Sequence, residues 1–120
     1  MTYDFAVWEG EPPSDGPAAG RECARLLRQY LEERELPPTD RMRAFVADLN
    51  GQWPDTTAHH DSAEDESPWA DSPLIDNASG PFIYIATLPA RADEVAVFAA
   101  ERAKAYGLVC FDVRDNRLLA

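Results

Sequence analysis

The sequence predicts an α+β fold: a two-layer sandwich in which a mixed β-sheet of about five strands carries three helices, mainly on one face. Two apolar runs without charge, residues 82–88 and 108–113, are typical of buried strands, and the segment between them has a helical apolar repeat. A third observation is the length, because 120 residues suit one hydrophobic core. We therefore expect a single domain over residues 1–120.

The chain begins with a predicted strand and two predicted helices. Residues 2–9 alternate between an apolar side and a mixed side, which is typical of a strand. Two helical apolar repeats follow: the first ends before Pro37, and the second runs from Thr39 to Gly51. Thr39 or Asp40 can serve as the N-cap of the second helix, and Gly51 is placed to end it.

The second half of the chain contains four predicted strands and one helix. The strands are residues 74–75, residues 82–88, residues 108–113 and residues 117–119. Turn residues around Gly80 join the first two as a hairpin, and Asp115-Asn116 joins the last two. The helix lies between the two long runs, has small residues on its apolar stripe and ends at Gly107. The order is strand, helix, helix, strand, strand, helix, strand, strand, with a right-handed parallel crossover between the long runs.

The alternation within the strands assigns side chains to the two faces of the sheet. We predict that the helices cover the face that carries Tyr3, Phe5, Val7, Ile83, Ile85, Val109 and Phe111. The opposite face would then carry Asp4, Trp8, Phe82, Tyr84, Cys110 and Asp112. That face is either covered by Trp69 and its neighbours or open, as an aromatic interaction surface rimmed by carboxylates.

The charge of the chain is uneven. The net charge is −11, and residues 44–90 contain eight acidic residues with no Lys or Arg. Such acidity argues against nucleic-acid binding, which depends on basic residues that neutralise phosphates. It favours a basic protein partner, although solubility alone explains it equally well. Residues 54–68 are acidic and lack large apolar side chains, which predicts a flexible loop.

The sequence contains no membrane or secretion signal that we can identify. No apolar run approaches the ~20 residues of a membrane span, and residues 1–10 lack the pattern of a signal peptide. We therefore expect a cytoplasmic protein without membrane contact. Cys23 lies on the apolar stripe of the first helix and Cys110 lies inside a strand, so both are expected to be buried, reduced thiols.

The candidate chemical groups do not form a catalytic pattern. His59-His60-Asp61, with residues 64–66, has metal-binding side chains, but adjacent histidines in a flexible segment lack the fixed spacing of a metal site. Both histidines of the chain lie there, so no Ser–His or Cys–His pair is supported. We expect no metal, no cofactor and no catalytic residue.

Asp4 and Asp112 are a pair of carboxylates that strand pairing could bring together. On adjacent strands they would be similar to the carboxylates that act as general acids. A solvated position at the rim of the sheet, or a contact to Arg114 or Arg117, explains them more simply.

Motifs spread over nearly the whole chain resemble those of small stand-alone bacterial proteins of unknown function. They are Tyr3-Asp4 with Val7-Trp8-Glu9-Gly10, Ser67-Pro68-Trp69 with Pro73-Leu74, Ala78-Ser79-Gly80-Pro81-Phe82-Ile83-Tyr84, and Gly107-Leu108-Val109-Cys110-Phe111-Asp112. Those proteins continue the last motif with Pro-Gln, where this chain has Val113-Arg114. In size, acidity and α+β layout the group is similar to immunity proteins, which neutralise secreted bacterial toxins. The resemblance implies no catalytic residues.

The favoured hypothesis is a non-enzymatic binding protein of immunity or antitoxin type, which caps or neutralises a basic protein. The acidic loop would steer the partner, and aromatic side chains of the sheet would anchor it. The expected partner-binding residues are Asp4, Trp8, Asp61, Glu64, Asp65, Glu66, Trp69, Asp71, Tyr84 and Asp112. The chain would act as a monomer or a weak homodimer.

Two other hypotheses stay open. The first is a small-ligand-binding domain or weak enzyme with a pocket between the sheet and the Trp69 segment. A concave cavity with Asp4 and Asp112 inside it would favour this hypothesis, and a flat face would favour the binding protein. The second is a structural or regulatory subunit with a self-complementary sheet face.

Overall fold

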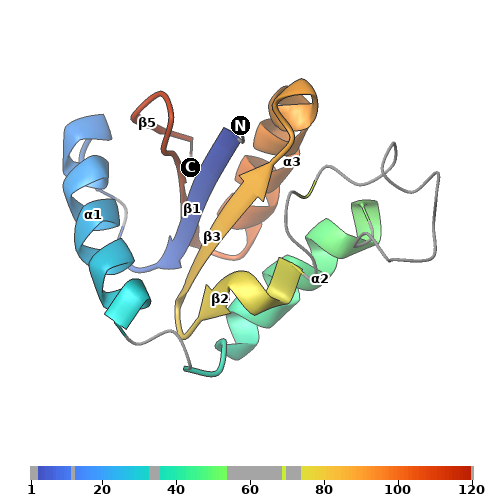
Figure 1. The fold of residues 1–120 in the computed structure, drawn as a ribbon, viewed down its shortest axis with the longest axis horizontal. Coiled ribbons are helices and arrows are strands. Elements are labelled where there is room, and N and C mark those ends of the chain that lie inside the picture. Colours follow the sequence, from blue (N-terminus) through green and yellow to red (C-terminus); the bar gives the residue numbers. More distant parts are fainter. Residues whose placement is uncertain (1–2, 12, 33–35, 54–68, 70–73, 120) are drawn as a thin grey trace.

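Figure 1 shows the computed structural model of the chain, which describes residues 3–11, 13–32, 36–53, 69 and 74–119. Within these residues the strands are β1 (Tyr3–Glu9), β2 (Ala78–Ser79), β3 (Phe82–Thr87), β4 (Leu108–Asp112) and β5 (Arg117–Leu118). The helices are α1 (Gly16–Glu32), α2 (Asp40–Gln52) and α3 (Ala92–Ala105), with 3-10 helices η2 (Leu74–Asn77) and η3 (Pro89–Arg91). The α+β class and the predicted order of strands and helices are confirmed. None of the helices in the described part of the chain has the length and apolarity that a membrane span requires.

The strands form one sheet in the order β2-β3-β1-β4-β5, and every neighbouring pair in it is antiparallel. The predicted mixed sheet is therefore wrong. β3 and β4 run in the same direction on either side of α3, but β1 lies between them, with Phe5 paired to both Ile85 and Asp112. β1 can occupy the centre because both of its faces are apolar: residues 5–8 are each at most 1% exposed.

Helices cover both faces of the sheet (Figure 1). α2 and α3 cover the face that carries Val7, and α1 covers the face that carries Trp8. Three layers thus replace the predicted two-layer sandwich with helices mainly on one face. The predicted faces of β4 are also wrong, because Cys110 pairs with Val7 and Val109 pairs with Trp8. Val109 and Phe111 consequently lie under α1, since a shift of one residue in a strand reverses all of its side chains.

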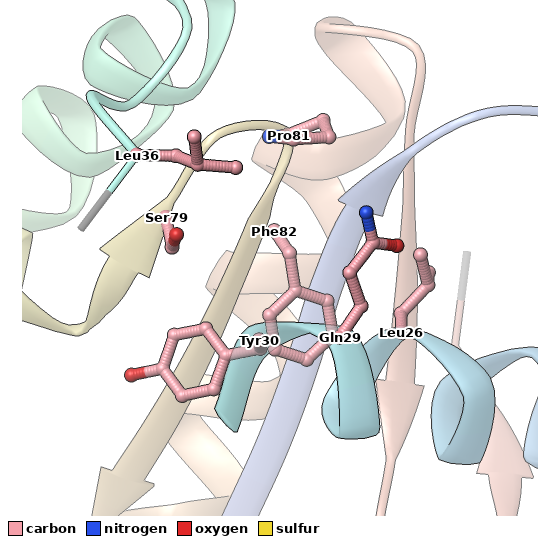
Figure 2. Close-up of a pocket in the computed structure, with 7 residues that line it drawn as sticks. All are labelled: Leu26, Gln29, Tyr30, Leu36, Ser79, Pro81 and Phe82. Carbon is pink, nitrogen blue, oxygen red and sulfur yellow. The ribbon is translucent and has the colours of Figure 1, made fainter. Parts of the chain in front are cut away.

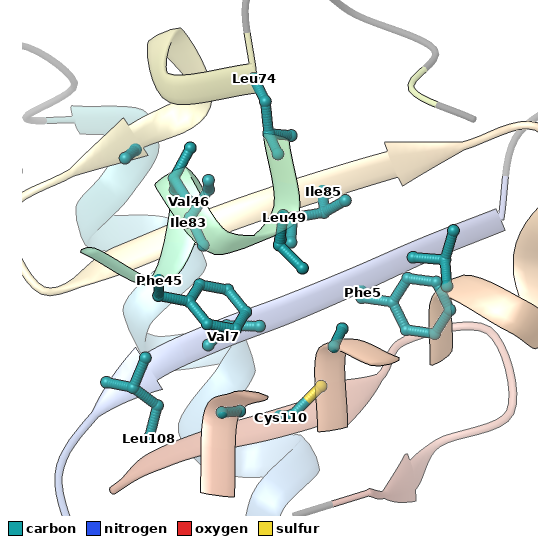
Figure 3. Close-up of a cluster of buried hydrophobic side chains, with 14 of the residues drawn as sticks. Phe5, Val7, Phe45, Val46, Leu49, Leu74, Ile83, Ile85, Leu108 and Cys110 are labelled. Carbon is teal, nitrogen blue, oxygen red and sulfur yellow. The ribbon is translucent and has the colours of Figure 1, made fainter. Parts of the chain in front are cut away.

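The larger core lies between the sheet and the helices α2 and α3 (Figure 3). Phe45 and Leu49 are fully buried there. Of the two candidate N-caps, Thr39 caps α2, because its hydroxyl accepts a hydrogen bond from the backbone N–H of Met42 at 3.1 Å. The predicted stripe of small residues on α3 is confirmed by buried alanines such as Ala99, which allow the helix to lie close to the sheet.

The smaller core lies between α1 and the opposite face of the sheet. Its buried members are Ala6, Trp8, Ala19, Cys23, Tyr30, Phe82, Val109 and Phe111. α1 also approaches the β4–β5 turn closely: a Cβ atom on Gly16 would lie 3.2 Å from the backbone oxygen of Asn116, and one on Gly20 would lie 3.2 Å from Asn116 Oδ1. Asn116 has φ +55°, a left-handed conformation that asparagine tolerates in turns.

The β2–β3 hairpin begins later than predicted. Residues 74–75 belong to η2, and the short strand that pairs with β3 is Ala78–Ser79. Leu74 is fully buried in the α2–α3 core, so its apolar character reflects the packing of η2. Gly80, with φ +56°, makes the turn. Gly51 lies within α2 and does not end it, since the helix continues to Gln52.

Candidate functional site

An apolar hollow opens between the end of α1 and the β2–β3 hairpin (Figure 2). It is lined by Leu26, Gln29, Tyr30, Leu36, Ser79, Pro81 and Phe82. Its empty space is about 300 Å³, including the part that is open to solvent. The lining residues come from α1, from the connection to α2 and from the hairpin, so the tertiary fold creates the hollow.

Two aromatic rings of the lining are held in place by the smaller core. Phe82 is 3% exposed, and its ring lies nearly parallel to that of Trp8 with the centroids 6.4 Å apart. The ring of Tyr30 packs against Phe82 at 5.2 Å. Because both rings are already packed, this wall of the hollow is formed before any partner binds.

The opposite side of the hollow is formed by Leu36, which is held through Gly80. The backbone N–H of Gly80 donates to the carbonyl oxygen of Leu36 at 3.3 Å, and Thr39 N–H donates to the carbonyl oxygen of Gly80 at 3.1 Å. The side chain of Leu36 remains 45% exposed, and Leu31 in the last turn of α1 is 62% exposed. Apolar surface is therefore concentrated around this end of α1.

Charges of both signs lie near the hollow. The backbone N–H of Glu9 donates to the carbonyl oxygen of Pro81 at 2.9 Å. The Glu9 carboxylate accepts a hydrogen bond from the hydroxyl of Thr39 and lies 3.9 Å from Arg41. On α1, Arg25 pairs with Glu22 at 2.7 Å. The hollow is thus not enclosed by a ring of acidic side chains.

The tryptophans proposed as partner anchors belong to the interior. Trp8 is 1% exposed and lies beneath α1, so the face that carries it is neither open nor covered by the Trp69 segment. Trp69 is 3% exposed and lies in the core on the other side of the sheet. Its indole N–H donates to the carbonyl oxygen of Trp53 at 2.8 Å, and the two rings pack edge to face at 5.9 Å. The expectation of an aromatic interaction surface on the sheet is therefore wrong.

The carboxylates of Asp4 and Asp112 do not form a pair. Phe5 lies opposite Asp112 in the sheet, so Asp112 shares the face of Phe5 while Asp4 points to the other face. Asp112 is 1% exposed and accepts hydrogen bonds from the hydroxyl of Tyr3 at 2.5 Å and from the backbone N–H of Asp115 at 3.0 Å. Arg117 lies 3.9 Å away, in agreement with the simpler alternative.

Tyrosine–aspartate hydrogen bonds connect separate elements at three places. Asp4 on β1 accepts from Tyr84 on β3 at 2.9 Å, and Asp48 on α2 accepts from Tyr106 at the end of α3 at 2.9 Å. The third is the Tyr3–Asp112 bond between β1 and β4. Burial and the bond to Asp4 raise the pKa of Tyr84, and the bond to Asp112, followed by burial, raises the pKa of Tyr3. These aspartates therefore stabilise the fold.

The two thiols are buried and unpaired, as predicted. Cys23 lies in the core beneath α1, and Cys110 lies in the core on the other side of the sheet. Burial raises the pKa of Cys23 to about 11 and that of Cys110 to about 12. Both are therefore protonated at neutral pH, which makes them poor nucleophiles and poor metal ligands.

Five predicted partner-binding residues lie outside the described residues. They are Asp61, Glu64, Asp65, Glu66 and Asp71. The predicted flexible loop at 54–68 and the His59-His60 pair lie there too. In the described ranges, no group of three or more His, Cys, Asp or Glu is arranged to hold a metal ion.

The residues that line the hollow were not recognised in the sequence. Tyr30 lies in the smaller core, and Leu26 packs against that core. The available sequence signal was the apolar pair Leu31 and Leu36 on either side of the charged residues 32–35, and both are exposed in the structure. No family model matches the chain, and no curated protein or solved structure matches it.

Proposed function

We propose that this chain is a non-enzymatic binding protein that caps or neutralises a basic protein partner, in the manner of immunity proteins. The observation that carries the proposal is the distribution of charge. The chain has 22 acidic and 11 basic residues, yet residues 44–90 contain eight acids and no base. A segment with one sign of charge attracts an oppositely charged protein and raises its association rate.

Most of the net negative charge belongs to residues outside the described ranges. The described ranges contain 14 of the 22 acids and 10 of the 11 bases, so −7 of the net charge of −11 lies outside them. Three tyrosine hydroxyls of the described ranges also donate to aspartates within the fold, namely to Asp4, Asp48, and Asp112 together with Asp115. We therefore assign the steering of the partner to residues 54–68, which carry five acids and no base.

The proposal is tested by the association rate of a basic partner, isolated on the immobilised protein at low salt and then purified. The double substitution Asp65→Lys with Glu66→Lys should slow association about tenfold or more at low ionic strength. Its matched control is Glu11→Lys with Glu101→Lys, which changes the net charge equally at two exposed positions of the folded body. The control should slow association much less. Equal effects of the two variants, or a rate insensitive to salt, would contradict the proposal.

A second candidate function is the binding of a small ligand. The hollow favours it, because its walls are largely apolar and it is concave. Its position differs from the expected pocket beside Trp69, which is itself packed against Trp53. Pockets that enclose a metabolite occupy about 300–1,000 Å³, and this hollow reaches that range only with its open part included. We therefore place this function second.

A further inference from the structure

We propose that the hollow at the end of α1 receives one aliphatic side chain of the basic partner, of the size of leucine, isoleucine or methionine. The side chain would be carried on a segment with lysine or arginine beside it. This inference rests on the proposed function and assigns the anchoring contact that the buried Trp8 and Trp69 cannot supply.

The chemistry of the lining favours an uncharged, apolar occupant. Leu26, Leu36, Pro81 and the ring of Phe82 present carbon atoms to the hollow (Figure 2). A charged group that entered would lose its hydration without an ionic partner there, which is unfavourable. An aliphatic group would instead gain free energy from leaving water, in proportion to the apolar surface that it buries.

The size of the hollow favours a single side chain. Its space of about 300 Å³ includes the open mouth, so the enclosed part is smaller than a metabolite site requires. Anchor side chains at protein interfaces occupy small, preformed pockets of this kind, surrounded by further contacts that exclude water. Leu36 extends the lining to the surface, because it is one of the four large apolar side chains that are exposed among the described residues.

The net charge selects the partner's chemistry. The charges beside the hollow are of both signs, since Glu9 lies near Arg41 and Arg25 pairs with Glu22. The preference for lysine or arginine beside the anchor therefore comes from the net charge of −11 of the whole chain. An aliphatic residue between basic residues would fit the apolar hollow and would also be attracted by the negative net charge of the chain.

The inference is tested with capped pentapeptides and the full-length, ¹⁵N-labelled protein. The first peptide has leucine between two pairs of lysines, the second has alanine in place of leucine, and the third has glutamates in place of the lysines. The first should shift the amide signals of Gln29, Tyr30, Ser79 and Phe82. The alanine peptide should bind about tenfold more weakly, because most of the buried apolar surface is lost. The glutamate peptide should bind more weakly than the first at low salt.

A matched pair of variants locates the binding. Leu36→Ser removes a lining side chain that is 45% exposed, and Leu88→Ser removes one that is 39% exposed and does not line the hollow. Leu36→Ser should weaken binding of the leucine peptide several-fold, and Leu88→Ser should leave it unchanged.

Three results would overturn the inference. In the first, the peptide shifts only amide signals of residues away from the hollow. In the second, the lysine and glutamate peptides bind equally well. In the third, the amide signals of the hollow residues shift without any peptide as the protein concentration is raised. The last result would assign the hollow to a second copy of the chain. If the peptides fail but a basic protein still associates in a salt-dependent way, the inference fails and the proposed function stands. If the leucine peptide binds in the hollow but no basic protein associates, the proposed function fails instead.

Discussion

Glycine-to-alanine substitutions test how tightly α1 packs against the β4–β5 turn. Gly16 and Gly20 lie in α1 beside that turn, and Gly51 in α2 serves as the reference. In a helix, alanine is more stable than glycine by roughly 0.5–1 kcal/mol, because glycine loses more backbone freedom on folding. A Cβ atom on Gly51 has nothing within 4 Å, so Gly51→Ala should raise the free energy of unfolding by about this amount. A Cβ on Gly16 would lie 3.2 Å from the backbone oxygen of Asn116. Gly16→Ala should therefore lower the free energy of unfolding by about 1–3 kcal/mol, as overpacking does.

Gly20 allows the gain in helix propensity to be separated from the cost of the close contact. The atom nearest to its added Cβ is the end of the Asn116 side chain, which a substitution can remove. Its Cβ would lie 3.2 Å from Asn116 Oδ1 and 3.7 Å from a ring carbon of Phe111. We expect Gly20→Ala to have little net effect, since the helical gain and the close contact offset each other. Asn116→Gly removes Oδ1 and retains a residue that suits φ +55°. In that background, Gly20→Ala should raise the free energy of unfolding by about 0.5–1 kcal/mol, as Gly51→Ala does.

The assay is urea unfolding at neutral pH, followed by tryptophan fluorescence and by far-ultraviolet circular dichroism. The three tryptophans of the chain are at most 7% exposed, so their emission reports on both cores. Gly51→Ala serves as the control for helix propensity. If Gly16→Ala stabilised the protein as much as Gly51→Ala does, α1 would not contact the turn and the reasoning would be refuted.

Four further predictions concern individual polar groups. Tyr106→Phe should lower the urea midpoint of unfolding only slightly, because Asp48 loses one of the groups that bind it at a solvent-accessible position; an unchanged midpoint would show that this bond adds nothing. The thiols of Cys23 and Cys110 have pKa values of about 11 and about 12 in the folded state against 9.0 without burial, so stability should be lost as the pH rises above 9.0. At pH 8 neither thiol should react with a thiol reagent until urea unfolds the chain, and rapid labelling of the folded protein would contradict their burial. Trp69→Phe should lower the free energy of unfolding by about 1–3 kcal/mol in the same titrations, because it leaves a buried carbonyl oxygen without its donor; an unchanged midpoint would contradict this.

Local patterns were sufficient for the elements but not for their arrangement. The alternation of residues 2–9 and the helical repeat of α1 gave those elements correctly. The faces of β4 were wrong because β4 is buried on both faces, so its alternation carries no information about which side faces which helix. The orientation of the β4 side chains is determined only by the pairing of Val7 with Cys110, a contact between residues distant in sequence.

The candidate site was the least predictable part for the same physical reason. The burial of Asp112 requires Tyr3, which is 109 residues away and donates the hydrogen bond that compensates it. The hollow requires Leu36 to lie beside Phe82, and no local spacing expresses that contact. The exposed Leu31 and Leu36 are individually unremarkable, because single apolar residues are common on protein surfaces.

In the proposed function, the position of α1 would divide binding between two surfaces that act over different distances. The aromatic face lies under α1, so the acidic segment and the apolar hollow remain as the proposed sources of attraction. Charge acts during the diffusional approach and mainly changes the association rate, whereas a buried apolar contact forms last and mainly changes the dissociation rate. Asp65→Lys with Glu66→Lys should therefore slow association of the partner without changing dissociation. Leu36→Ser should do the opposite, and its effect should be insensitive to salt because no charge is removed. If both variants altered only the association rate, the hollow would not be part of the interface.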